Sequence, residues 1–351
     1  MHYRPCNYCL VSPRRQSGAA LVIALLVFAV CAALMVAMRG EYELFYQRAA
    51  NSFVAWQGRA YLRGAEALAI QVLVLDYEMG ANSEQQRDDL KELWAAPPRA
   101  YPLEDGSFME GSLEDLQGRF NLNNLALTDS SEGGSEGVNQ AISPRFTPAQ
   151  QQFIRLLQSL ETLTLSEYEA IAIVEAIADW LDTDSIARLQ GAEDDYYLGR
   201  RPAHRAANRR FSAVSELRSV AHVTAELYQA LAPLVTVWPA QGGKLNIHTA
   251  SSAVLRSLNA DDELQPLTVD QASALFSLRD DTAFTSVDNL LAQPLFSGRQ
   301  TSGLKTLLGE TSEWFLLTAK AEVAGRNLHL YSVLHRNQRQ VEAFVRSTGE
   351  L

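Results

Sequence analysis

Residues 14–38 have the sequence RRQSGAALVIALLVFAVCAALMVAM, in which a short basic segment and one glycine precede an unbroken apolar run. Residues 19–38 contain no charged residue and no proline. At about 1.5 Å per helical residue, a run of this length spans the roughly 30 Å hydrocarbon core of a bilayer. The stretch therefore predicts a transmembrane helix near the start of the chain.

A secretory signal peptide is the alternative interpretation of this stretch. Its apolar region is only about 7–15 residues long and ends at a small-residue cleavage site, whereas this run is longer and ends in MVAMR at residues 35–39. Gly18 instead stands on the cytoplasmic side of the run, directly before Ala19. A peptidase that cuts after Gly18 would remove the basic leader and leave the whole apolar helix on the mature protein.

This combination of leader and helix resembles type IV prepilins and type II secretion pseudopilins. The resemblance implies that a prepilin peptidase cuts between Gly18 and Ala19 and N-methylates Ala19. Most members carry a glutamate where this chain has Ile23, and that glutamate is understood to pair with the terminal amine of a neighbouring subunit. Because an unpaired carboxylate is costly at that depth in a membrane, Ile23 favours a subunit at the filament tip.

Composition limits the class of protein further. The chain has 351 residues and a formal net charge of −11, and this acidity opposes a nucleic-acid-binding surface. Arginines ahead of the apolar run place the leader in the cytoplasm and the remainder in the periplasm, with the chain in the inner membrane. Cys6 and Cys9 lie in the leader and Cys31 in the span. We therefore expect no disulfide in the exported part.

The helical pattern continues beyond the apolar run. Good helix formers extend to about Asp76, and apolar residues recur at three- and four-residue spacing at Phe45, Ala49, Phe53, Trp56 and Ala60. One helix from Ala19 to Asp76 would be about 87 Å long. It would resemble the long N-terminal helix of a pilin, whose second half packs on a globular head. A membrane anchor followed by a separate soluble helix is the alternative.

The region after the helix predicts a strand and then a linker. Residues 107–116 alternate loosely between apolar and polar side chains, as expected of a strand. Residues 128–141 have the sequence TDSSEGGSEGVNQA, which is typical of a flexible linker. Gly133–Gly137 within it matches the G-x-S-x-G nucleophile elbow, but no apolar strand flanks this serine. We therefore do not expect a nucleophile there.

A weak internal repeat lies in the region that follows, which predicts helices from Thr147 to about Leu308. The sequence GRFNLNNL at residues 118–125 matches GKLNIHTA at 243–250 in the order of its glycine, basic, apolar and asparagine positions. An F-[ST]-x-V-x-x-L pattern recurs at 211–217 and 284–290. Two such units resemble helix-hairpin-helix or SAM-like modules, so we expect a large all-α domain.

Three segments near the C-terminus predict an antiparallel meander. Residues 314–324, 327–335 and 340–346 alternate with period two and are rich in β-branched and aromatic residues. We expect them to share one sheet with residues 107–116, packed on the long helix. The predicted fold class is α+β with an inserted all-α domain, divided into a leader at 1–18, a transmembrane half-helix at 19–38, the first part of the pilin-like domain at 39–118, the inserted domain at 119–310 and C-terminal strands at 311–351.

Four motifs then occur in a fixed order: DWLDTD at 179–184, GAEDDYY at 191–197, SELRSV at 215–220 and KLNIHTA at 244–250. Together with Ile23 they resemble the K-class minor pseudopilin of type II secretion systems. Two departures are the basic segment LGRRPAHRAANRR at 198–210 and His248, where the family usually has asparagine.

The resemblance implies a structural role and no enzymatic activity. It implies a subunit that forms or caps the pseudopilus tip and helps to initiate assembly, with I-class and J-class minor pseudopilins and the major pseudopilin as partners. Secreted substrates above the tip are further candidate partners. The alternatives are a type IV pilus minor pilin and a membrane-anchored helix-hairpin-helix protein that binds DNA, the second of which the net acidity opposes.

Six carboxylates form the strongest local cluster of chemistry-bearing residues. Such a cluster repels itself unless a hard cation or arginines neutralise it, and Ca²⁺ is bound by six to eight oxygens. The glycine and distal glutamate of an EF-hand loop are missing. The family resemblance supports calcium as the cofactor, and the alternative is a solvated acidic loop facing Arg188, Arg200 and Arg201. The six candidate residues are Asp179, Asp182, Asp184, Glu193, Asp194 and Asp195.

Overall fold

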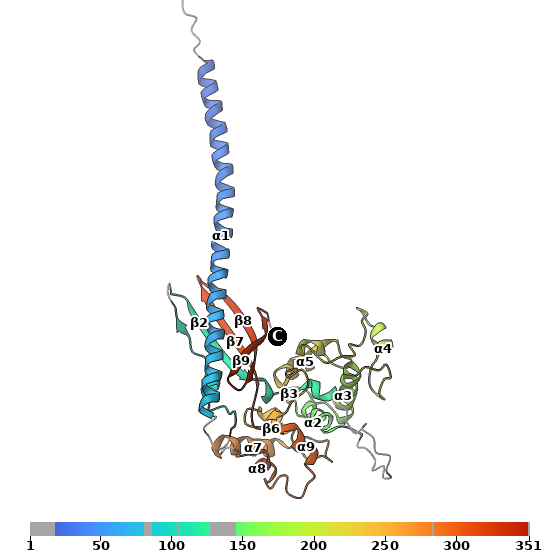
Figure 1. Ribbon diagram of the computed structural model, residues 1–351. Coiled ribbons are helices and arrows are strands. Elements are labelled where there is room, and N and C mark those ends of the chain that lie inside the picture. Colours follow the sequence, from blue (N-terminus) through green and yellow to red (C-terminus); the bar gives the residue numbers. More distant parts are fainter. Residues whose placement is uncertain (1–17, 81–85, 104–105, 127–144, 283, 350–351) are drawn as a thin grey trace, which may run out of the picture. The chain divides into compact units, whose positions relative to one another are not determined.

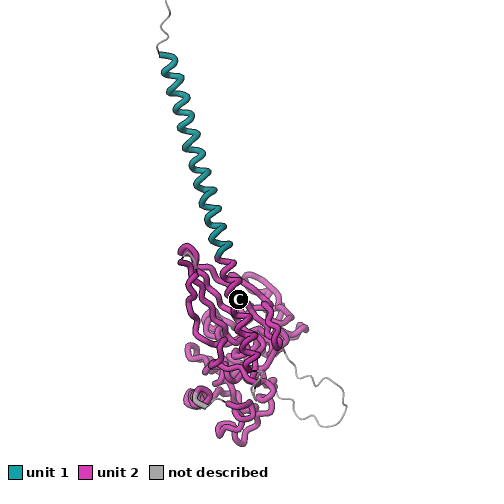
Figure 2. Tube along the Cα trace, turned by 60° about the vertical axis from the view of Figure 1, so that its left-hand side comes forward, with its two compact units in different colours: residues 1–57 teal, residues 58–351 magenta. Residues whose placement is uncertain are grey.

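The computed structural model describes residues 18–80, 86–103, 106–126, 145–282 and 284–349 (Figure 1). The chain divides into two compact units, residues 1–57 and 58–351 (Figure 2). Most of the predicted leader, with Cys6 and Cys9, lies outside the described residues, as do the G-x-S-x-G match and the whole of the predicted linker at residues 128–141.

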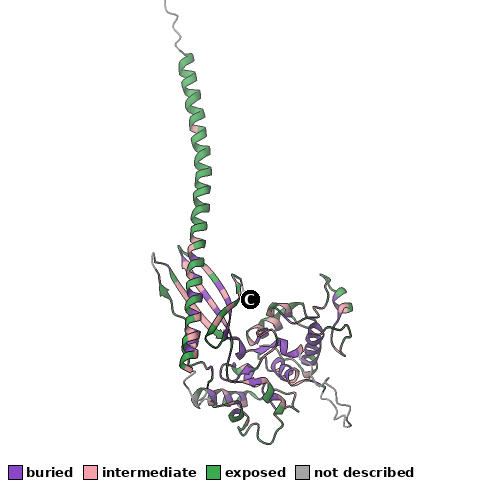
Figure 3. Ribbon diagram, in the orientation of Figure 1, coloured by how far each residue is buried: buried purple, intermediate pink, exposed green. Residues whose placement is uncertain are grey.

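The N-terminal helix α1 (Ala19–Gly80) is 62 residues long and continuous. It ends four residues beyond the predicted limit, and its continuity excludes a membrane anchor followed by a separate helix. Among the described residues it is the one helix long and apolar enough to cross a membrane. Its first half exposes large apolar side chains such as Leu21, Phe28 and Val36 (Figure 3), as expected of a surface that meets lipid or other apolar helices.

The second unit contains a five-stranded antiparallel sheet. Its strand order is β1-β2-β7-β8-β9, so β2 lies beside β7 although the whole middle region separates them in sequence (Figure 1). This pairing confirms the prediction that the strand near residue 110 joins the C-terminal strands. The strands are β1 (Tyr101–Pro102), β2 (Phe108–Asp115), β7 (Trp314–Val323), β8 (Arg326–Asn337) and β9 (Gln340–Ser347).

Two residues, Ala324 and Gly325, turn the chain between β7 and β8. Both have positive φ angles, 50° and 73°, as required for the tight turn that matches the twist of a hairpin. β7 shows regular alternation of buried and partly buried side chains, which was the signal that predicted it.

The second half of α1 packs on one face of this sheet. Leu62, Ala65, Ala69 and Leu73 recur at three- and four-residue spacing and contact buried side chains of β7 and β8. Leu73 is fully buried, which stabilises the fold by about 1.5–3 kcal/mol. At Gly58 a Cβ atom would lie 2.7 Å from the Leu328 side chain, so the helix approaches the sheet closely there.

The middle region, between β2 and β7, is mostly helical. α2 and α3 both begin with a capping box, at Thr147 and Ser166, which satisfies amide groups at the first turn of each helix. Their apolar faces contribute to the largest core cluster among the described residues, which the other helices of the region complete. The helices are α2 (Pro148–Gln158), α3 (Glu167–Leu181), α4 (Asp194–Leu198), α5 (Ala225–Leu231), α6 (Ser252–Arg256), α7 (Val269–Thr282), α8 (Val287–Leu291) and α9 (Ser302–Leu307).

The prediction that this region is helical throughout was wrong in detail. Two parallel strand pairs interrupt it: β3 (Phe120–Asn121) with β4 (Val235–Thr236), and β5 (Leu245–Asn246) with β6 (Leu308–Gly309). β3 and β5 lie at the asparagines of the two repeated motifs, so the repeat has a structural counterpart. Each asparagine side chain accepts a hydrogen bond from the backbone amide two residues later, Asn123 or His248.

Short 3₁₀ helices complete the fold. The first F-[ST]-x-V-x-x-L pattern forms the 3₁₀ helix η5 (Val214–Ser219), whereas the second forms the α-helix α8, capped by Ser286. At η5 the residue before the helix is Ala213, which has no side-chain acceptor to cap it. The others are η1 (Leu93–Ala95), η3 (Leu116–Gly118), η4 (Leu122–Ala126) and η6 (Ala232–Leu234).

Candidate functional site

The predicted acidic cluster lies at the C-terminal end of α3 and in the loop that follows. Asp179 is in the last turn of the helix and Asp182 is its C-cap. Negative side chains at this end of a helix oppose the helix dipole, so they need a positive partner. Arg188, from the following loop, donates to Asp179 Oδ1 and to Asp182 Oδ2, the second at 2.6 Å.

The loop is folded tightly around Asp179. This side chain is fully buried, and its Oδ2 accepts the Arg188 backbone amide at 3.0 Å. A Cβ atom at Gly191 would lie 1.8 Å from the same Oδ2, so only glycine fits there. Burial raises the pKa of Asp179, and the hydrogen bonds from Arg188 oppose that rise.

Three carboxylates of the cluster lie close together, and Arg188 contacts only one of them, Asp182. Asp182, Asp184 and Glu193 each place an oxygen within 4.8 Å of the others. Both carboxylate oxygens of Glu193, and Asp182 Oδ1, are buried without a hydrogen-bond partner. Burial, followed by repulsion from Asp179 and Asp182, raises the pKa of Glu193 to about 7. Buried oxygens without partners are costly, and an all-oxygen set of this kind suits a hard cation.

The remaining predicted residues lie elsewhere. Asp194 accepts the Ala206 backbone amide at 3.0 Å, and Asp195 is exposed in α4. Of the three arginines expected to face the acidic loop, Arg188 does so. Arg200 instead lies over the Tyr196 ring, and no ion pair is recorded for Arg201 among the described residues.

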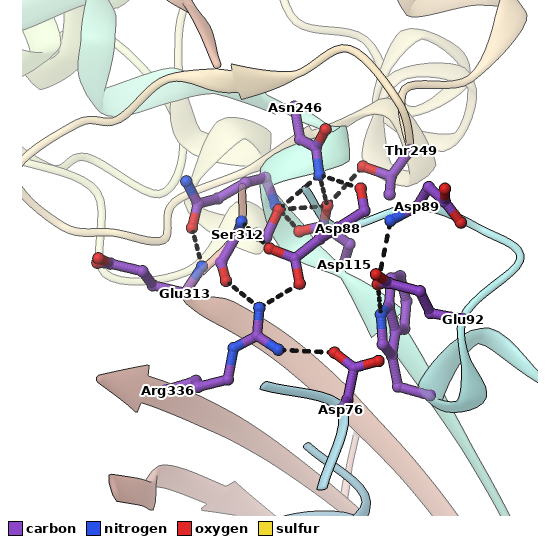
Figure 4. A network of polar contacts seen from close by, with 12 residues as sticks. Asp76, Asp88, Asp89, Glu92, Asp115, Asn246, Thr249, Ser312, Glu313 and Arg336 are labelled. Carbon is purple, nitrogen blue, oxygen red and sulfur yellow. Dashed lines mark hydrogen bonds and ion pairs between the residues drawn. The ribbon is translucent and has the colours of Figure 1, made fainter. Parts of the chain in front are cut away.

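A second charged cluster, the buried junction, was not predicted from the sequence (Figure 4). Arg336 of β8 donates to Asp76 of α1 at 2.9 Å, to Asp88, and to the Ser312 carbonyl at 2.8 Å. Asp115, at the end of β2, accepts from Ser312 Oγ at 2.6 Å. These contacts connect α1, the sheet and the segments next to it.

The buried junction also reaches the middle region. Asn246 of β5 donates to Asp115 at 3.1 Å and to Ser312 Oγ at 2.9 Å, and Thr249 donates to Asp115. Burial raises the pKa of Asp115 to about 6, and these hydrogen bonds oppose that rise. These partners are far apart in the sequence, so no local motif could predict that they meet. The one indication in the sequence was a charged residue, Asp115, at the end of a predicted strand.

The predicted processing positions lie at the start of α1. Gly18 directly precedes the helix, and Ala19 is its first residue. A Cβ atom at Gly18 would meet no atom within 4 Å, and its φ is not positive, so the fold does not require glycine there. Ile23 is 61% exposed on the helix surface.

The architecture is that of a pilin-like protein, because a long N-terminal helix with an apolar first half packs its second half on an antiparallel sheet. Residues 118–240 and 245–311 match the two family descriptions for "Type II secretion system (T2SS), protein K". The chain belongs to the type II secretion system protein K family.

Full-length relatives and a solved structure agree with this assignment. The chain is 30% identical over 335 residues to the type II secretion system protein K of Pectobacterium carotovorum subsp. carotovorum, covering 95% of this chain and 97% of the relative. It is 32% identical over 340 residues to the Pseudomonas aeruginosa protein, covering 96% and 94%. A chain in the crystal structure of the GspK-GspI-GspJ complex from enterotoxigenic Escherichia coli matches with a TM-score of 0.67 and 30% identity, covering 89% of this chain and 100% of that chain.

The chain is therefore a minor pseudopilin of the type II secretion system, with a structural and not an enzymatic role. This assignment sets aside the alternatives of a type IV pilus minor pilin and a DNA-binding protein.

Proposed function

We propose that this subunit forms or caps the tip of the periplasmic pseudopilus together with I-class and J-class minor pseudopilins, and helps to initiate pseudopilus assembly. The likeness to a chain from a GspK-GspI-GspJ complex carries this proposal. The major pseudopilin would continue the filament below, and secreted substrates would meet the tip above.

The long helix is the element that supports assembly. Its exposed apolar side chains suit the lipid of the inner membrane before assembly and the helices of neighbouring subunits afterwards. The chain would span the membrane once, with its globular part in the periplasm. A glutamate at position 23 would need the terminal amine of a neighbouring subunit as its partner, and a subunit at the tip lacks that neighbour. Ile23 has no charge and needs no such partner.

Cryo-electron microscopy of gold-labelled pseudopili would test this placement. We expect label from this subunit at one end of each filament, and label spaced along the shaft would contradict the proposal. Pull-down of I-class and J-class pseudopilins by the full chain provides a separate measure of assembly.

Processing between Gly18 and Ala19 belongs to the same proposal. The fold itself has no need of glycine at this position, and this supports a role for Gly18 in recognition by the prepilin peptidase. Mass spectrometry of the mature chain is expected to find N-methylated Ala19 at its start. An intact leader in assembled pseudopili would contradict this expectation.

Calcium is the proposed cofactor of the acidic loop. Asp182, Asp184 and Glu193 would provide carboxylate oxygens, while Arg188 already neutralises Asp179. A cation that binds only the folded chain stabilises it by about 2.7 kcal/mol at one hundred times its dissociation constant. Thermal unfolding of the full chain with Ca²⁺ and with a chelator tests this. Equal unfolding temperatures would remove calcium from the proposal.

The middle region is proposed to consist of two helix-hairpin-helix or SAM-like units inserted into a pilin-like domain at residues 119–310. The observation in support is that each repeated asparagine motif forms a short parallel strand pair that closes one half, β3 with β4 and β5 with β6. The domain limits given by the sequence stay predictions. Limited proteolysis followed by mass spectrometry would locate them.

A further inference from the structure

Two aliphatic side chains in the acidic loop are unusually exposed. Leu189 is 84% exposed and Ile186 is 78% exposed. These values exceed that of any other exposed large apolar side chain among the described residues, including Val36 of the apolar helix at 74%. Exposed apolar patches rimmed by polar residues mark interaction sites, and these two side chains stand three positions apart in one loop among polar residues. The cation site does not explain them, because aliphatic side chains bind no cation.

The basic segment at residues 198–210 is also unexplained by the proposed function. Arg205 lies 3.8 Å from Asp194 with its side chain 77% exposed, and Arg209 lies 3.1 Å from Glu216 with its side chain 56% exposed. Exposed ion pairs of this kind are weak, so a partner's carboxylates can compete for these arginines. Arg201 is exposed. The three arginines recur every four residues on a chain whose net charge is −11.

This segment is held in place between its exposed arginines. His204 packs against the Tyr197 ring with centroids 5.0 Å apart, and the Ala206 amide donates to Asp194. Asn208 Nδ2 donates to the Asp184 carbonyl at 3.1 Å, which joins the segment to the loop that carries Ile186. Arginines on a fixed backbone lose less entropy on binding than arginines on a free loop.

We propose that these elements form one docking surface, the basic-apolar surface, for an acidic segment of another protein that also carries large apolar side chains. Arginine pairs with carboxylates through two parallel hydrogen bonds, and the aliphatic side chains would contact the partner's apolar residues. Five residues define it: Ile186, Leu189, Arg201, Arg205 and Arg209.

Charge favours a protein segment over an anionic membrane as the occupant. Asp184 is exposed and its backbone carbonyl accepts from Asn208, next to Arg209 in the sequence, and the Asp194 carboxylate lies 3.8 Å from Arg205. A flat anionic membrane would meet these carboxylates together with the arginines and be repelled by them. A narrow acidic segment can follow the arginines and avoid the carboxylates.

The test uses the full chain in phosphatidylcholine nanodiscs, with calcium held constant. The probe is a fluorescein-labelled peptide in which Asp and Glu alternate with Leu and Phe, and binding is followed by fluorescence anisotropy. We expect the paired change Arg201→Gln with Arg205→Gln to weaken binding roughly tenfold. Ile186→Ser with Leu189→Ser should weaken binding by a similar factor. Added salt should weaken binding of the unchanged chain.

The matched control is Arg59→Gln with Arg99→Gln, which removes the same charge from exposed positions elsewhere. Unchanged unfolding temperatures for all variants show that the fold is intact. The proposal is overturned if the unchanged chain does not bind the peptide, if the control pair weakens binding equally, or if a peptide with lysines replacing its acids binds as tightly. Flotation of the nanodiscs with phosphatidylglycerol vesicles, without peptide binding, would also overturn it and assign the surface to lipid.

Discussion

The buried junction and the acidic loop both gather carboxylates, but they neutralise them differently. At the buried junction, Arg336 bridges Asp76 and Asp88, and Asp115 accepts three side-chain hydrogen bonds. In the acidic loop, Arg188 neutralises Asp179 and one side of Asp182, and Glu193 stays without a partner. The carboxylates that Arg336 and the hydroxyl and amide donors contact at the buried junction therefore have partners within the chain, whereas in the acidic loop Asp182 Oδ1 and both Glu193 oxygens have none; the calcium proposal addresses this difference.

The largest effect is expected at the buried junction. Arg336→Met would leave Asp76 and Asp88 buried without their positive partner, and we expect the free energy of unfolding to fall by about 3–5 kcal/mol. Denaturant unfolding of the full chain measures this change. Arg339→Met is the control, because Arg339 has a 74% exposed side chain and pairs with Glu78 at the surface. A loss below about 1 kcal/mol for Arg336→Met would show that the buried junction is not internally neutralised.

A smaller effect is expected where the acidic loop is tightest. Gly191→Ala would force a methyl group into the Asp179 carboxylate and displace Arg188, and we expect a loss of about 1–3 kcal/mol. Gly199→Ala is the matched control, since the nearest atom to a Cβ there is 3.5 Å away. Thermal unfolding of both variants compares them. Equal stability for the two would indicate that the loop adapts freely.

A substitution that removes one charge from the acidic loop tests whether Glu193 lacks a partner within the chain. Glu193→Gln removes an unpartnered buried charge, so in chelator we expect the free energy of unfolding to stay level or rise by about 1 kcal/mol. The same change should abolish the stabilisation by Ca²⁺. Asp195→Asn, at an exposed position, should leave the stabilisation intact. Stabilisation by Ca²⁺ that survives in Glu193→Gln would place the cation elsewhere.

The smallest effect is expected from pH. The folded pKa of Glu193 is about 7 and that of Asp115 about 6, both above the ordinary values. Through these two groups the folded chain binds more protons than the unfolded chain between about pH 4 and 7, so their contribution to stability falls as pH rises through that range. In chelator we expect about 1 kcal/mol more stability at pH 5.5 than at pH 7.5. Ca²⁺ should remove the part due to Glu193, because a bound cation favours the carboxylate.

The measurement for this last prediction is denaturant unfolding at both pH values, with Glu193→Gln as control. The part of the pH dependence that remains in the variant reports Asp115 and the other buried carboxylates. If the pH dependence in chelator were the same in Glu193→Gln as in the unchanged chain, Glu193 would make no contribution to it, and its pKa would not be raised in the folded chain.

The long helix and the sheet could be predicted because their signals are local. Each of three patterns lies within a single helix or strand. They are the apolar run after Gly18, the spacing of apolar residues at 45–60 and the alternation at residues 314–324. The pairing of β2 with the C-terminal strands could also be inferred, because a lone strand needs partners. The motif repeat at Asn121 and Asn246 was visible in the sequence, although its short parallel strands were not.

The contacts of the charged groups could not be predicted to the same degree. The acidic residues stand together in the sequence, but which of them Arg188 would satisfy depends on a tight loop that only Gly191 permits. The sequence gives no reason to prefer Arg188 over Arg200 or Arg201 as the partner of these carboxylates. In the structure Arg200 instead packs over the Tyr196 ring. The buried junction joins residues such as Asp76 and Arg336, whose proximity follows from tertiary packing alone.

The pairing of β2 with β7 also has a consequence for how the chain folds. Asp115 lies opposite Phe315 in the sheet, so the strand pair closes a loop of about 200 residues. Closing such a loop in an unfolded chain is entropically costly and slow. If the middle region folds first, it brings the ends of the loop together and shortens the search. We therefore expect the helical region to fold before the sheet, and the sheet to complete around α1 last.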